Sequence, residues 1–187
     1  MATTSTVTAT LSSDIAFFFT DTSSNASVNQ TSSLGYSLAL TAGTSTGQIN
    51  AAVRYTGYLP ASNTTYLNVT NFPKPILGGI YNVNFTDVKG VIVENQWNGA
   101  GAIGDALAIT ETNEIAYMTI SAPATSGFTG LFNGTAGNVR LSPQSTWIFN
   151  DRFGVSPGAM GGNQLIALTD TSGSGVPVSV IVVGVTG

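Results

Sequence analysis

Short stretches in which apolar and polar residues alternate, divided by turns rich in Gly, Ser, Thr and Asn, run through most of this 187-residue chain. Strict alternation places every second side chain on one face of a strand, whereas an amphipathic helix needs apolar residues three and four positions apart. No window of a dozen residues has that helical spacing, so the sequence predicts an all-β fold. The expected strands are 34–41, 48–59, 66–70, 79–85, 88–97, 105–110, 114–121, 138–141, 146–150, 164–169 and 176–185.

About ten strands of this length and spacing are typical of two packed antiparallel sheets. We therefore expect an antiparallel β-sandwich that is jelly-roll-like, rather than a closed barrel, and the strand order stays open. The last strand is apolar at nearly every position from 177 to 185. Strands covered on both faces have such near-continuous apolar runs. We expect this strand to be central in its sheet and its loss to abolish folding.

The N-terminal part of the chain differs from the rest. Residues 1–13 alternate Thr or Ser with small residues, which gives high β propensity but little apolar bulk. Residues 21–33 are rich in Ser, Thr and Asn without an apolar period, and they predict a long loop or linker. We therefore expect an extended N-terminal arm and linker over residues 1–33 and a β-sandwich domain over residues 34–187. The arm is expected to pair only when a partner is present.

Three consecutive phenylalanines, Phe17, Phe18 and Phe19, lie in this arm. Successive residues of a strand point to opposite faces, so the three rings cannot all pack on one side of a sheet. At least one ring is expected to make a contact outside the strand's own sheet. We interpret Phe17, Phe18 and Phe19 as candidate partner-binding residues.

The chain has few side chains that could act in catalysis or bind metals, because it contains no Cys, no His and only 7% charged residues. Thiolate nucleophiles, Ser-His and Cys-His pairs and the usual zinc ligands are thereby excluded. The five basic residues are scattered among nine carboxylates, and the net charge is −4. Nucleic-acid binding needs a basic patch that neutralises several phosphates. The sequence therefore indicates a protein that is not an enzyme, uses no cofactor and does not bind nucleic acid.

The apolar stretches are too short for a membrane span. Apolar stretches such as 16–19 and 180–183 are far below the roughly 20 residues that a spanning helix needs. Residues 1–10 have neither the basic start nor the apolar core of a secretory signal. We expect neither membrane insertion nor export by that route.

Two patterns that are sometimes functional are interpreted here as coincidental. Residues 98–104 contain the spacing G-x-G-x-x-G of dinucleotide-binding loops, but the residues that follow alternate like strands instead of opening a helix. Asp105, Glu111 and Glu114 offer oxygen atoms to a calcium ion, and Asp151 offers one member of a glycosidase pair, but neither spacing is typical of such sites. We interpret these carboxylates as solvated turn charges and predict no catalytic, cofactor-binding or metal-binding residue.

Aromatic residues provide one further candidate, a platform of flat rings on which a sugar could stack. Aromatics at alternate strand positions are mostly part of a sandwich core, and we favour that interpretation. The residues concerned are Tyr58, Tyr66, Tyr81, Trp97, Tyr117 and Trp147.

Four segments of the chain resemble, in the same order, segments of a known class of proteins. They are 38–48 (LALTAGTSTGQ), 58–67 (YLPASNTTYL), 88–94 (VKGVIVE) and 172–184 (SGSGVPVSVIVVG). Together they resemble small virion-associated proteins of tailed bacteriophages, and the resemblance covers residues 35–187. It implies a structural component of the phage particle that is made in the host cytoplasm and lies on the virion surface.

Residues and resemblance together favour a non-enzymatic virion protein, most simply a capsid decoration or cement protein on the outer shell. The expected partners are the major capsid protein or other virion proteins and further copies of this chain in a trimer, with the arm adding strands to a neighbour. A surface of Ser, Thr and Asn suits such assembly because no unpaired charge is buried. Two alternatives stay open: a tail- or fibre-associated protein that recognises host surface carbohydrate, and a strand-exchanging filament or surface-layer subunit.

Overall fold

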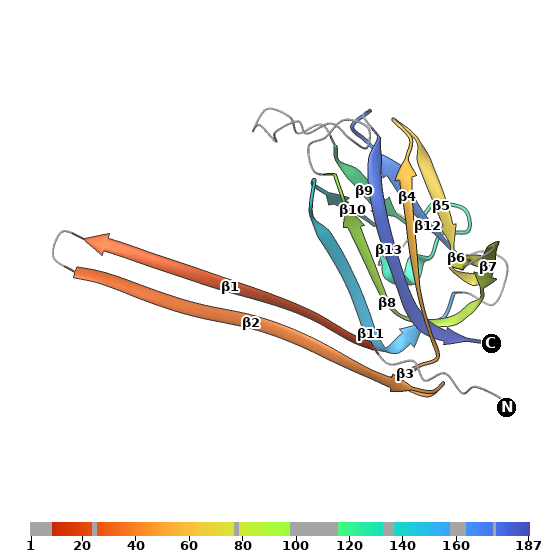
Figure 1. Ribbon diagram of the computed structural model, residues 1–187, viewed down its shortest axis with the longest axis horizontal. Coiled ribbons are helices and arrows are strands. Elements are labelled where there is room, and N and C mark those ends of the chain that lie inside the picture. The colour runs from red at the N-terminus through yellow and green to blue at the C-terminus, as the bar shows by residue number, and fades with distance from the viewer. Residues whose placement is uncertain are drawn as a thin grey trace.

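A computed structural model describes residues 9–23, 26–76, 79–97, 116–132, 137–157, 164–173 and 175–187 (Figure 1). In these residues the regular elements are strands, apart from two short 3-10 turns at Val69–Asn71 and Thr129–Leu131. The prediction of an all-β fold is confirmed. The strand expected at 105–110 lies outside the described residues.

Four long strands form an antiparallel sheet, which we call the first sheet, in the order β11-β8-β13-β4. Neighbouring strands are in continuous register over most of their length, but the register of β11 against β8 shifts between Asn150 and Val155. The strands are β4 (Ala51–Leu59), β8 (Phe85–Asn95), β11 (Thr146–Val155) and β13 (Val176–Thr186).

Four shorter strands form the second sheet, in the order β10-β9-β12-β5, which faces the first sheet (Figure 1). They are β5 (Thr64–Asn68), β9 (Met118–Ser121), β10 (Asn138–Leu141) and β12 (Leu165–Asp170). A small hairpin of β6 (Phe72–Ile76) and β7 (Gly79–Val83) lies between β5 and β8 in the chain.

The strand pairs of the two sheets are nested. β4 pairs with β13, β5 with β12, β8 with β11 and β9 with β10, always antiparallel. This is the order obtained when one hairpin of eight strands is rolled into two sheets, which defines a jelly roll. The predicted antiparallel, jelly-roll-like sandwich is confirmed, and the strand order that the sequence left open is now known.

The main core fills the space between the two sheets. Phe72 and Phe85 are fully buried there and meet edge to face, with ring centroids 6.2 Å apart. Aromatic pairs prefer this geometry, and burial of one such side chain contributes about 1.5–3 kcal/mol. The jelly-roll body therefore has a core of its own.

The last strand, β13, lies between β8 and β4. Val180 and Val182 are fully buried in the main core, and Val183 packs with Leu40 and Ile49 in a second, smaller cluster. The prediction that this strand is central and covered on both faces is confirmed. The near-continuous apolar run of this strand correctly indicated that both of its faces are covered.

The N-terminal region departs from the prediction. β1 (Ala9–Ser23) and β2 (Ala26–Ala42) form one long antiparallel hairpin, and the end of β2 also pairs in parallel with the short β3 (Gln48–Ile49). The expected loop over 21–33 is wrong, because residues 21–23 and 26–33 are strand. The expectation that the arm pairs only with a partner is also wrong, since β1 pairs with β2 of its own chain. Ser and Thr occur in turns and in strands alike. Here pairing with β1 makes residues 26–33 a strand. The division proposed after residue 33 falls within β2.

Candidate functional site

The hairpin of β1 and β2, called the arm below, is the feature that sets this molecule apart from a plain jelly roll. Its residue pairs run without interruption from Ala9 opposite Leu40 to Ser23 opposite Ala26. At a rise of about 3.4 Å per residue, a 15-residue strand extends about 50 Å. Figure 1 shows the arm projecting from one end of the body into open space. An isolated two-stranded hairpin is only marginally stable in water, so the arm is suited to bind something.

The three candidate partner-binding residues lie in the middle of β1. Phe17, Phe18 and Phe19 are opposite Ser32, Thr31 and Gln30 of β2. The structure thus places these positions on the projecting part of the arm, well away from the jelly-roll core. Their role in partner binding stays a prediction.

The base of the arm is fixed to the outer face of the first sheet. Leu40, Ile49 and Val183 form the small cluster already described, and each is at most 4% exposed. Gly43 N donates to Ile49 O over 2.9 Å, and Gly47 N donates to Arg152 O over 3.0 Å. These contacts hold the base but not the projecting part, so the arm leaves the body from a rigid support.

A row of isoleucines continues from this cluster across the outer face of the first sheet. Ile181 is opposite Ile92 in the register, and Ile92 is opposite Ile148. The three side chains are partly buried and pack against the cluster of Leu40 and Val183. The outer face of the first sheet is therefore apolar beside the arm, whereas Glu94 lies one row further along β8.

The edge strand β4 borders a groove of about 440 Å³ that is lined by Ala52, Val53, Arg54, Thr56 and Lys74. Arg54 and Lys74 are both exposed. Arg54 Nε donates to Ser179 Oγ over 2.9 Å, which holds the guanidinium against the first sheet. The groove lies where β6 comes next to β4, and it carries positive charge.

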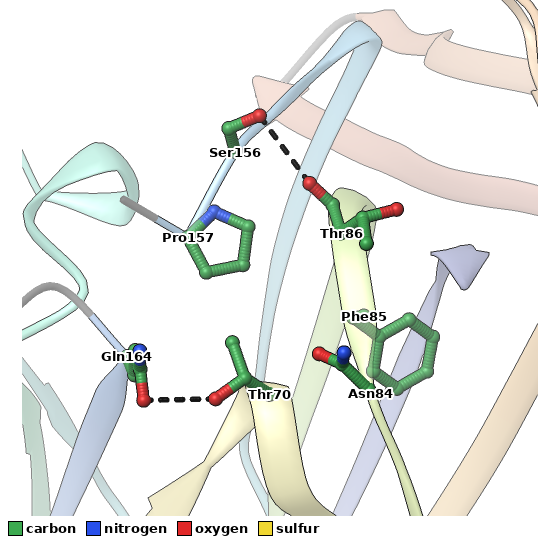
Figure 2. A pocket seen from close by; sticks show the side chains of 7 residues that line it. All are labelled: Thr70, Asn84, Phe85, Thr86, Ser156, Pro157 and Gln164. Atoms are coloured by element: carbon green, nitrogen blue, oxygen red, sulfur yellow. Dashed lines mark hydrogen bonds between the residues drawn. The ribbon is translucent and has the colours of Figure 1, made fainter. Parts of the chain in front are cut away.

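A second hollow, of about 420 Å³, lies where the end of β11 meets the start of β8 (Figure 2). Thr70 Oγ1 donates to Gln164 Oε1 over 2.8 Å, and Ser156 Oγ donates to Thr86 O over 3.3 Å. None of its lining residues carries a charge. This hollow can form hydrogen bonds but has no acid, base or nucleophile activated by a neighbour. The lining residues are Thr70, Asn84, Phe85, Thr86, Ser156, Pro157 and Gln164.

Asp170, at the end of β12, is the most strongly hydrogen-bonded carboxylate of the described residues. It is 2% exposed and accepts bonds from Ser62 N at 2.9 Å, Ser172 N at 2.7 Å, Gly175 N at 3.0 Å and the Ser172 hydroxyl. Burial acts to raise the pKa of Asp170, but the bonds from Ser172, Ser62 and Gly175 outweigh it, and the pKa lies below its ordinary value. Its carboxylate oxygens accept from turn amides and from the Ser172 hydroxyl, so Asp170 joins two turns and has a structural role.

Lys89 is the only buried cation among the described residues, with 1% exposure. Its Nζ lies 2.5 Å from Asp87 Oδ2 and 2.5 Å from Phe153 O. Gly154 follows with φ +82°, and a Cβ there would lie 2.2 Å from Asp87 Oδ1. The ion pair therefore stabilises the irregular end of β11, where a glycine is required, and it leaves no free group for chemistry.

The other residues singled out from the sequence are placed as follows. Asp151 Oδ1 accepts from Phe153 N over 2.8 Å in the same irregular segment, so it stabilises a turn. The ring of Trp147 stacks on that of Phe132 with centroids 5.4 Å apart. Trp147 and Trp97 both pack against the main core. Residues 98–104 and the carboxylates Asp105, Glu111 and Glu114 lie outside the described residues.

The remaining aromatics lie at separate places in the fold rather than together on one sheet. Tyr58 on β4 and Tyr66 on β5 are 45% and 57% exposed, and the Arg140 guanidinium lies 3.7 Å from the centre of the Tyr117 ring. Tyr81 lies on β7. A sugar platform made of all six aromatics is therefore not assembled by the described part of the chain.

Sequence reasoning did not find Asp170, Lys89 or the groove beside β4. The segment Asp170-Thr-Ser-Gly173 has the composition of an Asx turn, which is a usable signal for the first of these. Lys89 lies in an apolar strand with nothing in the sequence to show its partner at Phe153, 64 positions away. The groove depends on Lys74 approaching β4, which only the fold brings about.

Neither a membrane-spanning helix nor a cluster of metal ligands is present in the described residues. No helix there is long and apolar enough to cross a membrane. No group of three or more Asp, Glu, His or Cys residues is close enough to hold a metal ion in that part of the chain.

Fold and surface together define the class as a jelly-roll protein with a projecting β-hairpin. No known protein family matches the chain, and no curated protein is significantly similar to it. Among solved structures, the crystal structure of the Yersinia pseudotuberculosis-derived mitogen is similar to this chain with a TM-score of 0.34 and 13% identity, over 73% of this chain and 87% of that chain. A TM-score this low carries no argument about function.

Proposed function

We propose that the protein is a non-enzymatic structural component of a tailed-phage virion, a decoration or cement protein that binds the outer capsid shell. The observation that carries the proposal is the arm, whose base packs on the first sheet and whose strands β1 and β2 project from the body as a paired ribbon (Figure 1). Such a ribbon offers unpaired backbone donors and acceptors along its edge, and β-augmentation by a neighbouring subunit satisfies them. The body then acts as a stable anchor for the arm.

Three further features support an assembly role. The phage-like segments lie within residues 35–187. The isoleucine row offers apolar area beside the arm, which protein interfaces use in their cores. The shortage of charge lowers the cost of burying large surfaces between subunits.

Copy number tests the proposal directly. Purified virions are analysed by quantitative mass spectrometry, with the major capsid protein as the internal standard. A decoration protein is expected in proportion to the shell subunits, hence in hundreds of copies per particle, as the symmetry of a shell requires. Absence from particles, or a number of about a dozen that fits a tail, overturns the proposal.

The arm is tested by a truncated protein that lacks residues 2–33. Particles stripped of the protein are mixed with full-length or truncated protein, and binding is followed by sedimentation. The expected result is that the truncated protein folds but loses at least about tenfold in affinity, because each factor of ten needs only about 1.4 kcal/mol of lost strand pairing. A matched control with Phe153, which is 75% exposed on the body, changed to Ala should bind as before. Unchanged binding of the truncated protein excludes strand donation to the shell.

A further inference from the structure

The ladder of the arm places two kinds of residue on its two faces. Alternate positions of a strand share a face, and positions directly opposite each other in an antiparallel pair lie on the same face. The odd-numbered positions of β1 therefore share a face with the even-numbered positions of β2, as in the pair of Leu11 with Leu38. We call this the apolar face. Its large apolar residues are Leu11, Ile15, Phe17, Phe19, Val28, Leu34, Tyr36, Leu38 and Leu40.

The opposite face of the arm is polar. It holds the even-numbered positions of β1 and the odd-numbered positions of β2, as in the pair of Ser12 with Ser37. Phe18, opposite Thr31, is its one large apolar residue, and its other positions are Ser, Thr, Asn, Asp, Ala and Gly. Antiparallel strands with this division commonly have one face packed and one face in water. The arm is thus an amphipathic ribbon.

Leu40 shows what covers the apolar face where the arm meets the body. Its side chain is 2% exposed and packs with Ile49 and Val183 against the outer face of the first sheet. Further along the arm, Figure 1 shows no other element of the described residues beside the projecting part of β1 and β2. The apolar face therefore continues from a packed contact into a stretch that the described part of the same chain does not cover.

The dimensions of the apolar face suit a second arm as its partner. Two strands of 15 residues, each about 50 Å long and spaced about 4.8 Å apart, present a face of about 500 Å². Two such faces in contact bury about 1,000 Å² in total, which reaches the area that specific association needs. The same face on both partners makes the contact self-complementary, as a two-fold dimer requires. Both polar faces then point outward, which is the arrangement of a two-layer β-sandwich.

Charge determines how two stacked arms are oriented. Asp21, opposite Val28 and two positions from the end of β1, is the only charged residue on the apolar face, whereas Asp14 lies on the polar face. Arms stacked in parallel would bring the two copies of Asp21 together, which is unfavourable. Arms stacked in antiparallel place them at opposite ends of the contact, at its solvated rim. The antiparallel stack is therefore favoured.

We propose that the arms of two copies stack through their apolar faces, in antiparallel orientation, around a two-fold axis near Ala16, the middle residue of β1. Phe17 and Phe19 then lie in the interface between the copies, and Phe18 lies on its outer side. The edges of both ribbons stay open, so the stack and β-augmentation by a shell protein do not exclude each other. The inference goes beyond the proposed function, because it concerns contacts between copies and requires no virus particle.

The three neighbouring phenylalanines provide the test. The full-length protein is examined by size-exclusion chromatography with light scattering over a range of concentrations, and a dimer is expected. Phe17→Ser with Phe19→Ser should raise the dissociation constant of the dimer at least about tenfold, because central aromatic residues dominate the binding energy of interfaces. Phe18→Ser removes a ring of the same size from the intervening position and should leave dimerisation unchanged, because that position is on the other face.

Several results overturn the inference: a protein that is monomeric at all concentrations, a trimer in place of a dimer, or a Phe18→Ser protein that associates as weakly as the double variant. A monomer whose binding to capsids needs Phe17 and Phe19 would identify a shell protein as the occupant of the apolar face, and it would equally overturn the stack. If the double variant fails to fold, Leu34→Ser on β2 replaces it, with Ser33→Ala on the polar face as the matched control.

Spin labels measure the orientation of the two arms. The chain has no cysteine of its own, so Ala16→Cys or Thr22→Cys attaches one label per copy on the polar face. Thr22 lies six positions from the proposed axis, so an antiparallel stack separates its two labels by about 40 Å along the ribbon, at about 3.4 Å per residue. The distance from label to label, measured by pulsed electron paramagnetic resonance, should therefore be longer at Thr22 than at Ala16. Equal distances at the two positions would contradict the antiparallel stack.

The outcome is separable from that of the proposed function. Dimers that depend on Phe17 and Phe19, formed by a protein that is absent from virions, would refute only the decoration role. A protein present in hundreds of copies per virion that does not dimerise through these residues would refute only the stacking of the arms.

Discussion

The body and the arm of this protein are both made of antiparallel strands, but they are stabilised in different ways. Strands of the body pair with neighbours and also pack a face against the opposite sheet, with Val180 and Phe85 among the fully buried residues. In the arm, β1 pairs with β2 along one ladder from Ala9 to Ser23, and this ribbon projects from the body (Figure 1). Burial of apolar area is the main stabilising term in folding, and an isolated ribbon has little of it. We therefore expect the body to fold by itself, and we expect the arm to gain stability when it binds a partner.

The two regions also differ in where their charged residues lie relative to residues of opposite charge. Buried charges of the body are satisfied internally, as in the pair of Lys89 with Asp87 and in the amide bonds to Asp170. The charges of the arm, Asp14 and Asp21, have no basic residue near them in the sequence. The charges that are paired within the body stabilise its fold.

Removal of β13 should have the largest effect, because this strand is paired on both sides and buried on both faces. A chain ending at residue 175 loses the partner of β4 and of β8 together with the valines at the centre of the core. We expect no folded state, seen as loss of the near-ultraviolet circular dichroism signal and of dispersed amide resonances. A truncated protein that still unfolds cooperatively would show that the body does not depend on its central strand.

Phe85→Ala tests the body through a single side chain that is fully buried. Removing a large core aromatic costs about 3–5 kcal/mol, because transfer energy is lost and a cavity remains. Chemical denaturation measures the free energy of unfolding. The control is Phe153→Ala, since Phe153 is 75% exposed and its loss should change stability by less than about 0.5 kcal/mol. Equal effects of the two changes would contradict the assigned core.

Asp170→Asn tests the internal satisfaction of charge in the body. The amide nitrogen of Asn faces the backbone donors of Ser62, Ser172 or Gly175, so at least one bond is lost at a cost of about 1–3 kcal/mol. Because the pKa of Asp170 is lowered in the folded state, its contribution is complete above the ordinary pKa of an aspartate and is lost as the pH falls through the lowered folded-state value. Unfolding measured from pH 6 to pH 2 should show a smaller acid destabilisation in Asp170→Asn than in the unchanged protein. Parallel pH profiles would contradict this assignment.

Prediction from sequence succeeded where side-chain alternation alone decides the structure. The jelly-roll-like sandwich and the central position of β13 followed from apolar periodicity, which directly reports burial. The hairpin strand over residues 26–33 was missed because its Ser, Thr and Asn residues are equally typical of turns, and only a pairing strand distinguishes the two. Lys89 and the groove between Arg54 and Lys74 were missed because residues far apart in the sequence create them. Phe17, Phe18 and Phe19 were found as candidates, and their partner remains to be tested.

Removal of residues 2–33 should have the smallest effect on the body, although it deletes more residues than any other change considered. The shortened chain keeps Leu40 and Ile49, which are 2% and 0% exposed and pack on Val183 at the base of the arm. Since about 1 kcal/mol shifts the midpoint of thermal unfolding by about 2–4 °C in a protein of this size, we expect a shift within about 2 °C. Leu40→Ala in the full-length chain is the informative contrast, because losing one buried leucine costs about 2–5 kcal/mol and should lower the midpoint more than losing the whole projecting ribbon. If instead the truncation lowers the midpoint more than Leu40→Ala does, the projecting ribbon contributes to the stability of the body, and the distinction between a self-sufficient body and a partner-dependent arm is wrong.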